Sequence, residues 1–295
     1  MAGRRQRDAH RRPRGVALPE GPVPISTGFA ELRTERHAPG QVTVLVNGVP
    51  SSFNDIDDPR WLEFEYMQYM AAVIGRLTDG PLTVVHLGAG ACTFARWVDA
   101  VRPGSAQLAV DIDAELVRLA REWFDLPRSP ALRLRVGEAR EAVAAMAERS
   151  VDVVIRDAFA NDSTPAHLCT VEFAGQVARV LRPGGVYLAN CADRPPLGLA
   201  RAEAATLRAV FDDVAVVAEP GQVKGRRHGN VVLAGAHRRM LDDAALAREL
   251  RSLAVPARLL HGPELDALVS GARPLYDESG PNSEEATPDG AASAT

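Results

Sequence analysis

The sequence predicts an α/β fold with a Rossmann-like, mostly parallel sheet of seven strands, preceded by a small N-terminal β element. Apolar, strand-like segments alternate with helical segments between residues 82 and 234, which is typical of a parallel sheet with helices on both faces. The first of these strands runs directly into the turn Gly88-Ala89-Gly90. The last two strands are joined by a Gly-rich connection, which predicts an antiparallel hairpin rather than another crossover helix.

Composition and charge indicate a globular protein without a general attraction to polyanions. The chain has 295 residues, of which 46% are hydrophobic and 24% charged, and its net charge is −4. This is enough for one large α/β domain with a small appendage. The balance of charge argues against nucleic acid and anionic membranes as partners, and no segment approaches the roughly 20 apolar residues of a membrane span.

The three cysteines are far apart and odd in number: Cys92, Cys169 and Cys191. Their spacing predicts neither a metal site nor a disulfide framework. A reducing, cytoplasmic setting is the simplest interpretation of this cysteine usage.

Changes in composition divide the chain into five segments. Residues 1–22 are basic and residues 277–295 are acidic and rich in small residues, so we expect both to be disordered tails. Between them we expect a small N-terminal β element with a leading helix over residues 23–78, a Rossmann-like domain over residues 79–238, and a helical extension over residues 239–276.

The N-terminal β element is clearest over residues 41–58. Val42, Val44 and Val46 alternate with other residues, and Asn47-Gly48 is a strong hairpin-turn dipeptide. A helix is expected next, over residues 61–77, because the preceding Asp-Pro pair supplies a capping residue and an early proline.

The domain itself is expected to begin with the strand before the glycine turn. Strands are expected over residues 82–87, 108–112, 132–136, 151–155, 185–189, 214–218 and 230–234, with helices over 94–101, 115–124 and 201–210. A closing antiparallel hairpin is typical of AdoMet-dependent transferases and unusual for nicotinamide dehydrogenases. The predicted architecture is therefore the Rossmann-like, seven-strand AdoMet-transferase fold.

In such a sheet, ligands bind at the carboxyl ends of the strands, where the strand order reverses. After the first strand, Gly88 and Gly90 allow a tight turn and close backbone approach to a ligand, although an ordinary strand-to-helix turn is the alternative. Thr93 replaces the third glycine of the dinucleotide fingerprint. After the second strand, Asp111 lies 23 positions beyond Gly88, where a carboxylate can accept both ribose hydroxyls. Asp113 is expected to cap the next helix.

Acids also follow the third and fourth strands. Glu138 can accept from an adenine amino group, or it can simply begin a surface helix. Asp157 ends an apolar strand, where a carboxylate is costly unless it is paired or hydrogen-bonded. It is expected to face the reactive carbon of a donor, with capping of the following loop as the alternative. Asp162, in that loop, is a further candidate for contact with the substrate.

Seven segments, taken in order, resemble the spermidine synthase family, and above all a bacterial branch described as spermidine synthase-like. They are LVNGVPSS, DDPRWLEFEYMQYM, HLGAGA, VDID, VGEAR, RDAFANDSTPAHLCTVEF and LRPGGVYLAN. The resemblance spans roughly residues 42–234. It implies a small N-terminal β domain, and transfer of an aminopropyl group from decarboxylated AdoMet to a small amine acceptor in polyamine biosynthesis.

The resemblance also implies roles for matching residues. Asp157 matches the catalytic aspartate that deprotonates or orients the attacking amine, and Tyr66 matches the tyrosine of the family's Y-(Q/H)-E-M segment. We expect Tyr66 and Asp162 to bind substrate. The donor, decarboxylated AdoMet or AdoMet, is expected to contact Gly88, Ala89, Gly90, Asp111, Ile112, Glu138 and Ala139. No metal is expected, and family members commonly form homodimers.

Several positions depart from the family pattern. Ala91 and Cys92 stand within the segment that reads GGGDGG in the family, so the acid near the donor's propylamine end is missing. Met67 and Gln68 replace the family's Gln or His and its Glu. Ser51 stands where many members carry Gln, and the family's Asp-Pro signature after the fourth strand is absent.

These departures leave two other hypotheses open. The missing acid at Ala91 suggests a methyltransferase that acts on a small molecule with AdoMet. The degraded motifs and charged tails suggest a non-catalytic adenosyl-binding module. The carboxylates of Asp55, Asp57, Asp58 and Asp162 are expected either to attract a polycationic acceptor or to form a solvated acidic turn.

Overall fold

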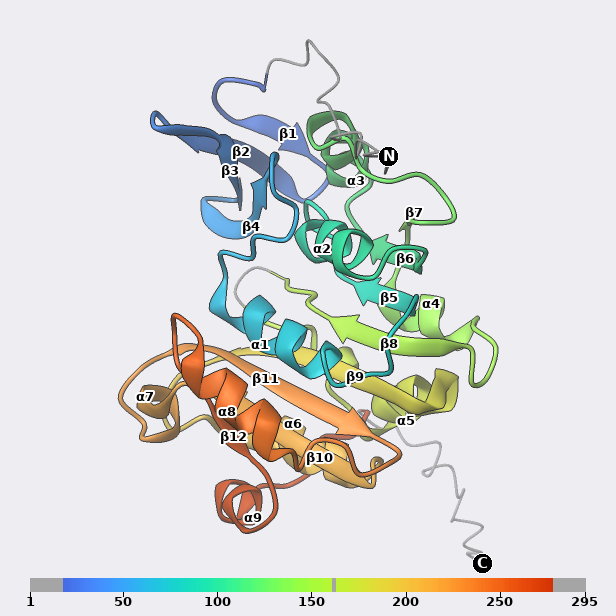
Figure 1. The fold of residues 1–295 in the computed structure, drawn as a ribbon, viewed down its shortest axis with the longest axis vertical. Coiled ribbons are helices and arrows are strands. Elements are labelled where there is room, and N and C mark those ends of the chain that lie inside the picture. Colours follow the sequence, from blue (N-terminus) through green and yellow to red (C-terminus); the bar gives the residue numbers. More distant parts are fainter. Residues whose placement is uncertain (1–17, 161–162, 278–295) are drawn as a thin grey trace, which may run out of the picture.

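The chain forms a small and a large β-sheet flanked by helices (Figure 1). The structure, a computed structural model, describes residues 18–160 and 163–277. The predicted tails at residues 1–17 and 278–295, together with Asp162, lie outside these described residues.

The parts of the two predicted tails that the structure describes are held against the fold. Leu18 packs on the apolar core of the N-terminal sheet, and Asp277 forms an ion pair with Arg140. These contacts place Leu18 and Asp277 against described parts of the fold, and the division into ordered segments and disordered tails stays a prediction. Apolar contacts and ion pairs of this kind can order segments near the chain ends whose composition is typical of disorder.

The N-terminal sheet is antiparallel, with four strands in the order β1-β2-β3-β4. They are β1 (Val23–Ile25), β2 (Gly28–Glu35), β3 (Ala38–Val46) and β4 (Val49–Asp55). The predicted hairpin at Asn47-Gly48 joins β3 to β4, and these residues have φ angles of 52° and 82°, as a two-residue type I′ turn requires. The strands β1 and β2 extend the sheet beyond the expected residues 41–58.

The main sheet has the order β12-β10-β11-β9-β8-β5-β6-β7. Its strands are β5 (Thr83–Leu87), β6 (Ala106–Asp111), β7 (Arg133–Val136), β8 (Val151–Arg156), β9 (Leu181–Asp193), β10 (Asp213–Ala218), β11 (Gly229–Ala236) and β12 (Arg258–Leu260). Strands β5 to β9 are parallel, whereas β11 pairs antiparallel with both β9 and β10. This arrangement confirms the closing hairpin and the AdoMet-transferase topology.

The edge strand β12 corrects the prediction of a purely helical C-terminal extension. It pairs antiparallel with β10, placing Leu260 opposite Val216, and so makes the sheet one strand wider than the seven expected. A strand of three residues is too short for hydrophobic periodicity to separate it from a helix or a loop.

Helices cover both faces of the main sheet (Figure 1). They are α1 (Glu65–Ile74), α2 (Thr93–Val101), α3 (Ala114–Trp123), α4 (Ala139–Ala144), α5 (Val171–Val180), α6 (Gly198–Arg208), α7 (Pro220–Val223), α8 (Ala244–Ser252) and α9 (Pro263–Val269), with a 3₁₀ turn η1 (Ala166–Leu168). One apolar core lies under α1, α2 and α8, and another lies under α4, α5 and α6. Within residues 18–160 and 163–277, no helix combines the length and hydropathy needed to cross a bilayer.

The helix α1 begins later than the Asp-Pro pair predicts. Asp58 accepts from the backbone N–H and the guanidinium of Arg60 and caps no helix. Phe64 is the N-cap instead. The side chains of Tyr66 and Tyr69 on α1 are buried against the sheet.

Candidate active site

The carboxyl ends of β5, β6 and β8 meet at one edge of the main sheet. The Asp157 N–H donates to the Leu87 carbonyl oxygen at 2.8 Å, and the Gly88 N–H donates to the Val110 carbonyl oxygen at 2.9 Å. These bonds continue the parallel ladders beyond the strand ends. As a result, Asp111 and Asp157 leave the sheet at the same edge, on either side of the glycine turn (residues 88–90).

The glycine turn is packed so closely that two of its positions require glycine. Gly88 has a φ of +90°, and a Cβ atom there would lie 2.2 Å from the carbonyl oxygen of Asp157. Gly90 has a φ of +48°, and a Cβ atom there would lie 2.7 Å from Ser52 Oγ. All three residues of the turn nevertheless remain partly exposed, so a ligand can reach their backbone.

The backbone amides of this turn are already hydrogen-bonded within the protein. Those of Ala89 and Gly90 donate to Asp111 Oδ2 at 2.9 and 3.0 Å, and that of Ala91 donates to Ser52 Oγ at 3.0 Å. A dinucleotide site would use such amides to hold a pyrophosphate. The turn is therefore arranged for a ligand without phosphate at this position.

Asp111 both shapes the turn and keeps capacity for a ligand. Besides the two bonds to Oδ2, its Oδ1 accepts from the Asp113 N–H at 2.9 Å, so three of about four acceptor positions on the carboxylate are used. Ile112, which lies between Asp111 and Asp113 in the sequence, is 68% exposed. Asp113 caps α3 by accepting from the Leu116 N–H at 2.7 Å, as predicted.

Glu138 is the N-cap of α4, so it has the second of the two roles expected for it, at the start of a helix. Its Oε2 accepts from the Glu141 N–H at 2.8 Å, and its Oε1 lies 3.0 Å from His167 Nε2. Burial alone would raise the pKa of Glu138, but these hydrogen bonds hold the pKa below its ordinary value. Val136, two residues earlier at the end of β7, is 49% exposed. Ala139 is the first residue of α4.

Asp157 lies at the centre of a three-residue cluster. Tyr66 Oη donates to Asp157 Oδ2 at 2.7 Å, and Asn190 Nδ2 donates to Asp157 Oδ1 at 2.8 Å. Withdrawal from solvent raises the pKa of Asp157 above its ordinary value, although both hydrogen bonds oppose this rise. Burial and the charge of Asp157 raise the pKa of Tyr66 well above its ordinary value, so the phenol remains a hydrogen-bond donor.

Sequence reasoning missed Asn190. It lies near the end of β9, where Gly185 and the apolar run after it lead into a polar amide. The signal that singled out Asp157, a polar residue closing an apolar strand, was therefore present for Asn190 as well. Asn190 became recognisable only once β8 and β9 were paired in register.

The N-terminal sheet covers the position of the missing family acid. Ala91 is 1% exposed, and its carbonyl oxygen accepts from Asn54 Nδ2 at 3.1 Å. Thr93 Oγ1 donates to the Phe53 carbonyl oxygen at 2.8 Å. A carboxylate at position 91 would be enclosed by β4, so the small residue there is matched to close packing of the two sheets.

Behind the cluster lies a buried ion pair. Arg156 is fully buried, and its Nη2 lies 2.7 Å from Glu203 Oε2 on α6. The same guanidinium donates to the carbonyl oxygens of Leu168 and Asn190, each at 3.0 Å. This side chain therefore fastens together the segments that carry Asp157, Asn190 and the turn η1.

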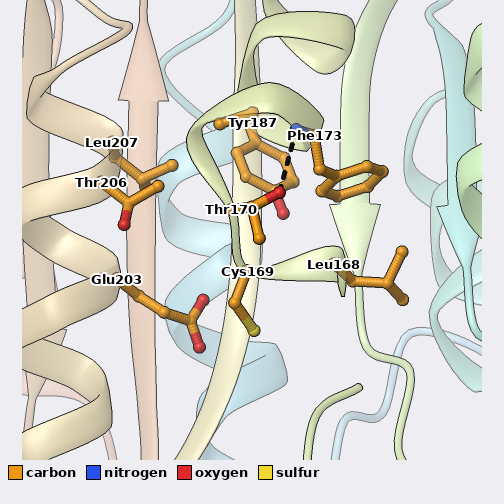
Figure 2. Close-up of a pocket in the computed structure, with 9 residues that line it drawn as sticks. Leu168, Cys169, Thr170, Phe173, Tyr187, Glu203, Thr206 and Leu207 are labelled. Atoms are coloured by element: carbon orange, nitrogen blue, oxygen red, sulfur yellow. Dashed lines mark hydrogen bonds between the residues drawn. The ribbon is translucent and has the colours of Figure 1, made fainter. Parts of the chain in front are cut away.

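Two hollows lie away from the strand ends that carry Asp111 and Asp157. Figure 2 shows Glu203 and Cys169 among the residues that line a small cavity beside the ion pair. Its volume of about 10 Å³ has room for about one water molecule. A groove of about 360 Å³ is lined by Arg121 and Asp125 among others. It lies beyond the C-terminal end of α3, at the sheet edge opposite Asp157. The candidate site is instead the open edge between Asp111 and Asp157.

Two acids at the end of β4 and in the loop after it, Asp55 and Asp58, serve the local fold. Asp55 accepts from the backbone amides of Asp57 and Asp58, each at 2.9 Å, and Asp58 pairs with Arg60. This supports the solvated-turn alternative over attraction of a polycation.

His86, inside β5, is a core histidine that is hydrogen-bonded to Gln107, and burial lowers its pKa to about 4.

Comparison with protein families and solved structures shows what the whole chain is similar to. The family model described as a methyltransferase domain matches residues 85–189. A crystal structure of a probable spermidine synthase from Corynebacterium glutamicum is 37% identical, with a TM-score of 0.84, and the match covers 92% of this chain and 100% of that one.

Two curated proteins match a smaller part of the chain. The polyamine aminopropyltransferase of Chromobacterium violaceum is 32% identical over 139 residues, which are 46% of this chain and 52% of that protein. The human eEF1A lysine and N-terminal methyltransferase is 27% identical over 146 residues, which are 46% of this chain and 21% of that protein. The chain thus spans about half of the first relative's length and a fifth of the second's.

Proposed function

Because the chain belongs to the spermidine synthase-like family of the AdoMet methyltransferase superfamily, we propose that it transfers an aminopropyl group from decarboxylated AdoMet to an amine acceptor in polyamine biosynthesis. The observation that carries this proposal is the Asp157 carboxylate, which Tyr66 and Asn190 hold beside the glycine turn. An amine that attacks a sulfonium-bound carbon needs an acceptor for its proton at this place.

The donor is proposed to lie along the edge from β8 to β7. The remaining acceptor position of Asp111 suits a ribose hydroxyl. Two exposed apolar side chains, Ile112 and Val136, suit the faces of an adenine ring. Glu138 can accept from the adenine amino group, and the backbone N–H of Ala139, at the start of α4, has no partner within its helix and can donate to a ring nitrogen.

The proposed transfer is an in-line displacement. The amine lone pair forms a C–N bond while the C–S bond breaks, and the sulfur leaves as a neutral thioether, methylthioadenosine. An alkylamine has a pKa of about 10 and arrives protonated at neutral pH. Asp157 attracts this cation and accepts its proton, and its raised pKa makes it a stronger base. Tyr66 and Asn190 keep the carboxylate in one orientation.

A turnover assay tests this proposal. Purified protein is incubated with decarboxylated AdoMet and a panel of amines that includes putrescine. The expected result is release of methylthioadenosine with at least one amine. Absence of release across a broad panel contradicts aminopropyl transfer.

Methyl transfer from AdoMet is a second candidate, favoured by the buried Ala91 at the position of the missing acid. Without that acid, little in the turn distinguishes the carboxylated donor from the decarboxylated one. Calorimetry with both donors separates the candidates, because tighter binding of AdoMet supports methylation. Binding of a donor without any turnover would instead support a non-catalytic adenosyl-binding module.

We place this activity in the cytoplasm. The three cysteines, Cys92, Cys169 and Cys191, are free and buried, a state that a reducing compartment maintains. The proposed partner is a small amine, and the homodimer implied by the family resemblance stays a prediction.

Removal of Asn190 is expected to shift the pH dependence of turnover. In Asn190→Ala, the Asp157 carboxylate loses a hydrogen bond that lowers its pKa. The pKa of Asp157 therefore rises further, and the acid limb of the kcat/KM profile moves to higher pH. Tyr66→Phe removes the other donor and should move the limb in the same direction. An acid limb that stays in place in both variants contradicts titration of Asp157 in the reaction.

A further inference from the structure

The segment over residues 272–277, named here the C-terminal strap, crosses the helices that follow β8 and β9. The Leu275 N–H donates to Thr206 Oγ1 at 2.8 Å, and the Leu275 carbonyl oxygen accepts from the Val171 N–H at 2.8 Å. The Asp277 N–H donates to Glu172 Oε2 at 2.9 Å. The strap is therefore fastened to α6 and to the first turn of α5.

At its C-terminal end, the strap forms an ion pair with Arg140 in the first turn of α4. The two carboxylate oxygens of Asp277 accept from the two terminal nitrogens of Arg140 at 2.8 and 2.5 Å. This is the bidentate geometry that makes a guanidinium–carboxylate pair directional. Through this hydrogen bond and its charge, Arg140 holds the pKa of Asp277 below its ordinary value.

The contact continues from Arg140 towards the donor edge. Arg140 Nη1 also donates to the His167 carbonyl oxygen at 3.2 Å, and His167 Nε2 lies 3.0 Å from Glu138 Oε1. His167 belongs to η1, a single 3₁₀ turn with little stability of its own. Asp277 is thus linked to the carboxylate of Glu138 through the side chain of Arg140 and through His167, whose backbone carbonyl accepts from Arg140 and whose ring contacts Glu138.

We propose that Asp277 is a positioning residue for the donor, acting through Arg140 and His167 to orient Glu138 towards the adenine amino group. This inference rests on the proposed function, since it assumes that an adenosyl group binds at Glu138. The strap would then complete the adenine end of the site, far along the sheet edge from Asp157. Its loss should weaken nucleoside binding without changing the chemistry at Asp157.

Methylthioadenosine is a suitable probe, because its binding needs neither turnover nor knowledge of the acceptor. In Asp277→Ala, the dissociation constant measured by calorimetry should rise about threefold to tenfold, as expected for loss of a partly exposed, charge-assisted contact. In turnover, the donor KM should rise while kcat at saturating donor is unchanged. Asp277→Glu keeps the charge and should recover part of the affinity.

The matched control is Asp266→Ala. It breaks an ion pair with Arg208 of 2.7 Å, on α9 and away from the donor edge, and it should leave methylthioadenosine affinity unchanged. Thermal unfolding of both variants checks that they fold alike.

The outcomes separate the inference from the proposed function. If the wild type does not bind methylthioadenosine, the proposed function fails and this inference falls with it. If the wild type binds and Asp277→Ala binds equally well, or if both variants lose affinity alike, the positioning role alone is overturned.

Discussion

Asp157→Asn is expected to lower kcat by about 10²- to 10⁴-fold, the range attributed to a positioned general acid or base. Asparagine has nearly the same shape and can still bond with both neighbours, accepting from Asn190 and donating to the oxygen of Tyr66. It cannot take a proton from the amine. The rate of methylthioadenosine release, measured at saturating donor and amine, checks this prediction.

The same substitution should not cost stability at neutral pH. The pKa of Asp157 is raised by withdrawal from solvent, so the folded state binds its proton more tightly than the unfolded state does. Stability is then lost as pH rises through the window between the ordinary carboxyl pKa and the raised one. Above that window the ionised carboxylate weakens the fold, and asparagine lacks this cost.

Denaturant unfolding at several pH values measures this effect. Asp157→Asn should be at least as stable as the wild type at pH 7, and the difference should shrink at the acid end of the window. Asp266→Asn, on the exposed surface of α9, provides the control for activity. Retention of full turnover in Asp157→Asn would contradict the proposed role of the carboxylate as base, whichever group is transferred.

Gly88→Ala is expected to destabilise the fold by about 3 kcal/mol or more, from backbone strain together with overpacking. The φ of +90° is unfavourable for alanine, and the new Cβ atom would lie 2.2 Å from the carbonyl oxygen of Asp157. Relief of this overlap must separate β5 from the segment that carries Asp157. Methylthioadenosine binding should therefore be lost along with stability.

Gly175→Ala offers a matched control. Gly175 lies inside α5, and a Cβ atom there would meet no atom within 4 Å. Alanine has the higher helix propensity, so this variant should be more stable by about 0.5–1 kcal/mol. Denaturant midpoints of both variants test the contrast. Equal behaviour of the two would show that the turn is not packed as described.

Local patterns predicted the elements that define the fold. The alternation of strands and helices, the closing hairpin and the hairpin at Asn47-Gly48 follow from periodicity and turn chemistry within short windows. Periodicity was weakest where elements are short or their ends depend on a cap. It missed β12 and placed the start of α1 too early, because Asp58 bonds to Arg60 rather than to the helix.

The residues of the candidate site could also be predicted only in part from the sequence. Gly88, Asp111 and Asp157 were identified from sequence because each closes a strand, and the carboxyl ends of parallel strands share one edge. The alternative role of Glu138 as a helix cap was also visible beforehand, and the structure shows that role directly. The adenine contact of Glu138 stays a prediction.

By itself, the sequence determined which residues stand at the strand ends. Hydrophobic periodicity and the turns that glycine allows depend only on residues that are close together in the sequence. Only the tertiary structure decided what those residues touch. Asn190 meets Asp157 across 33 positions, Ser52 meets Ala91 across 39, and Arg140 meets Asp277 across 137. Such pairs form because the packing of whole elements brings them together, and no local pattern of residues records that packing.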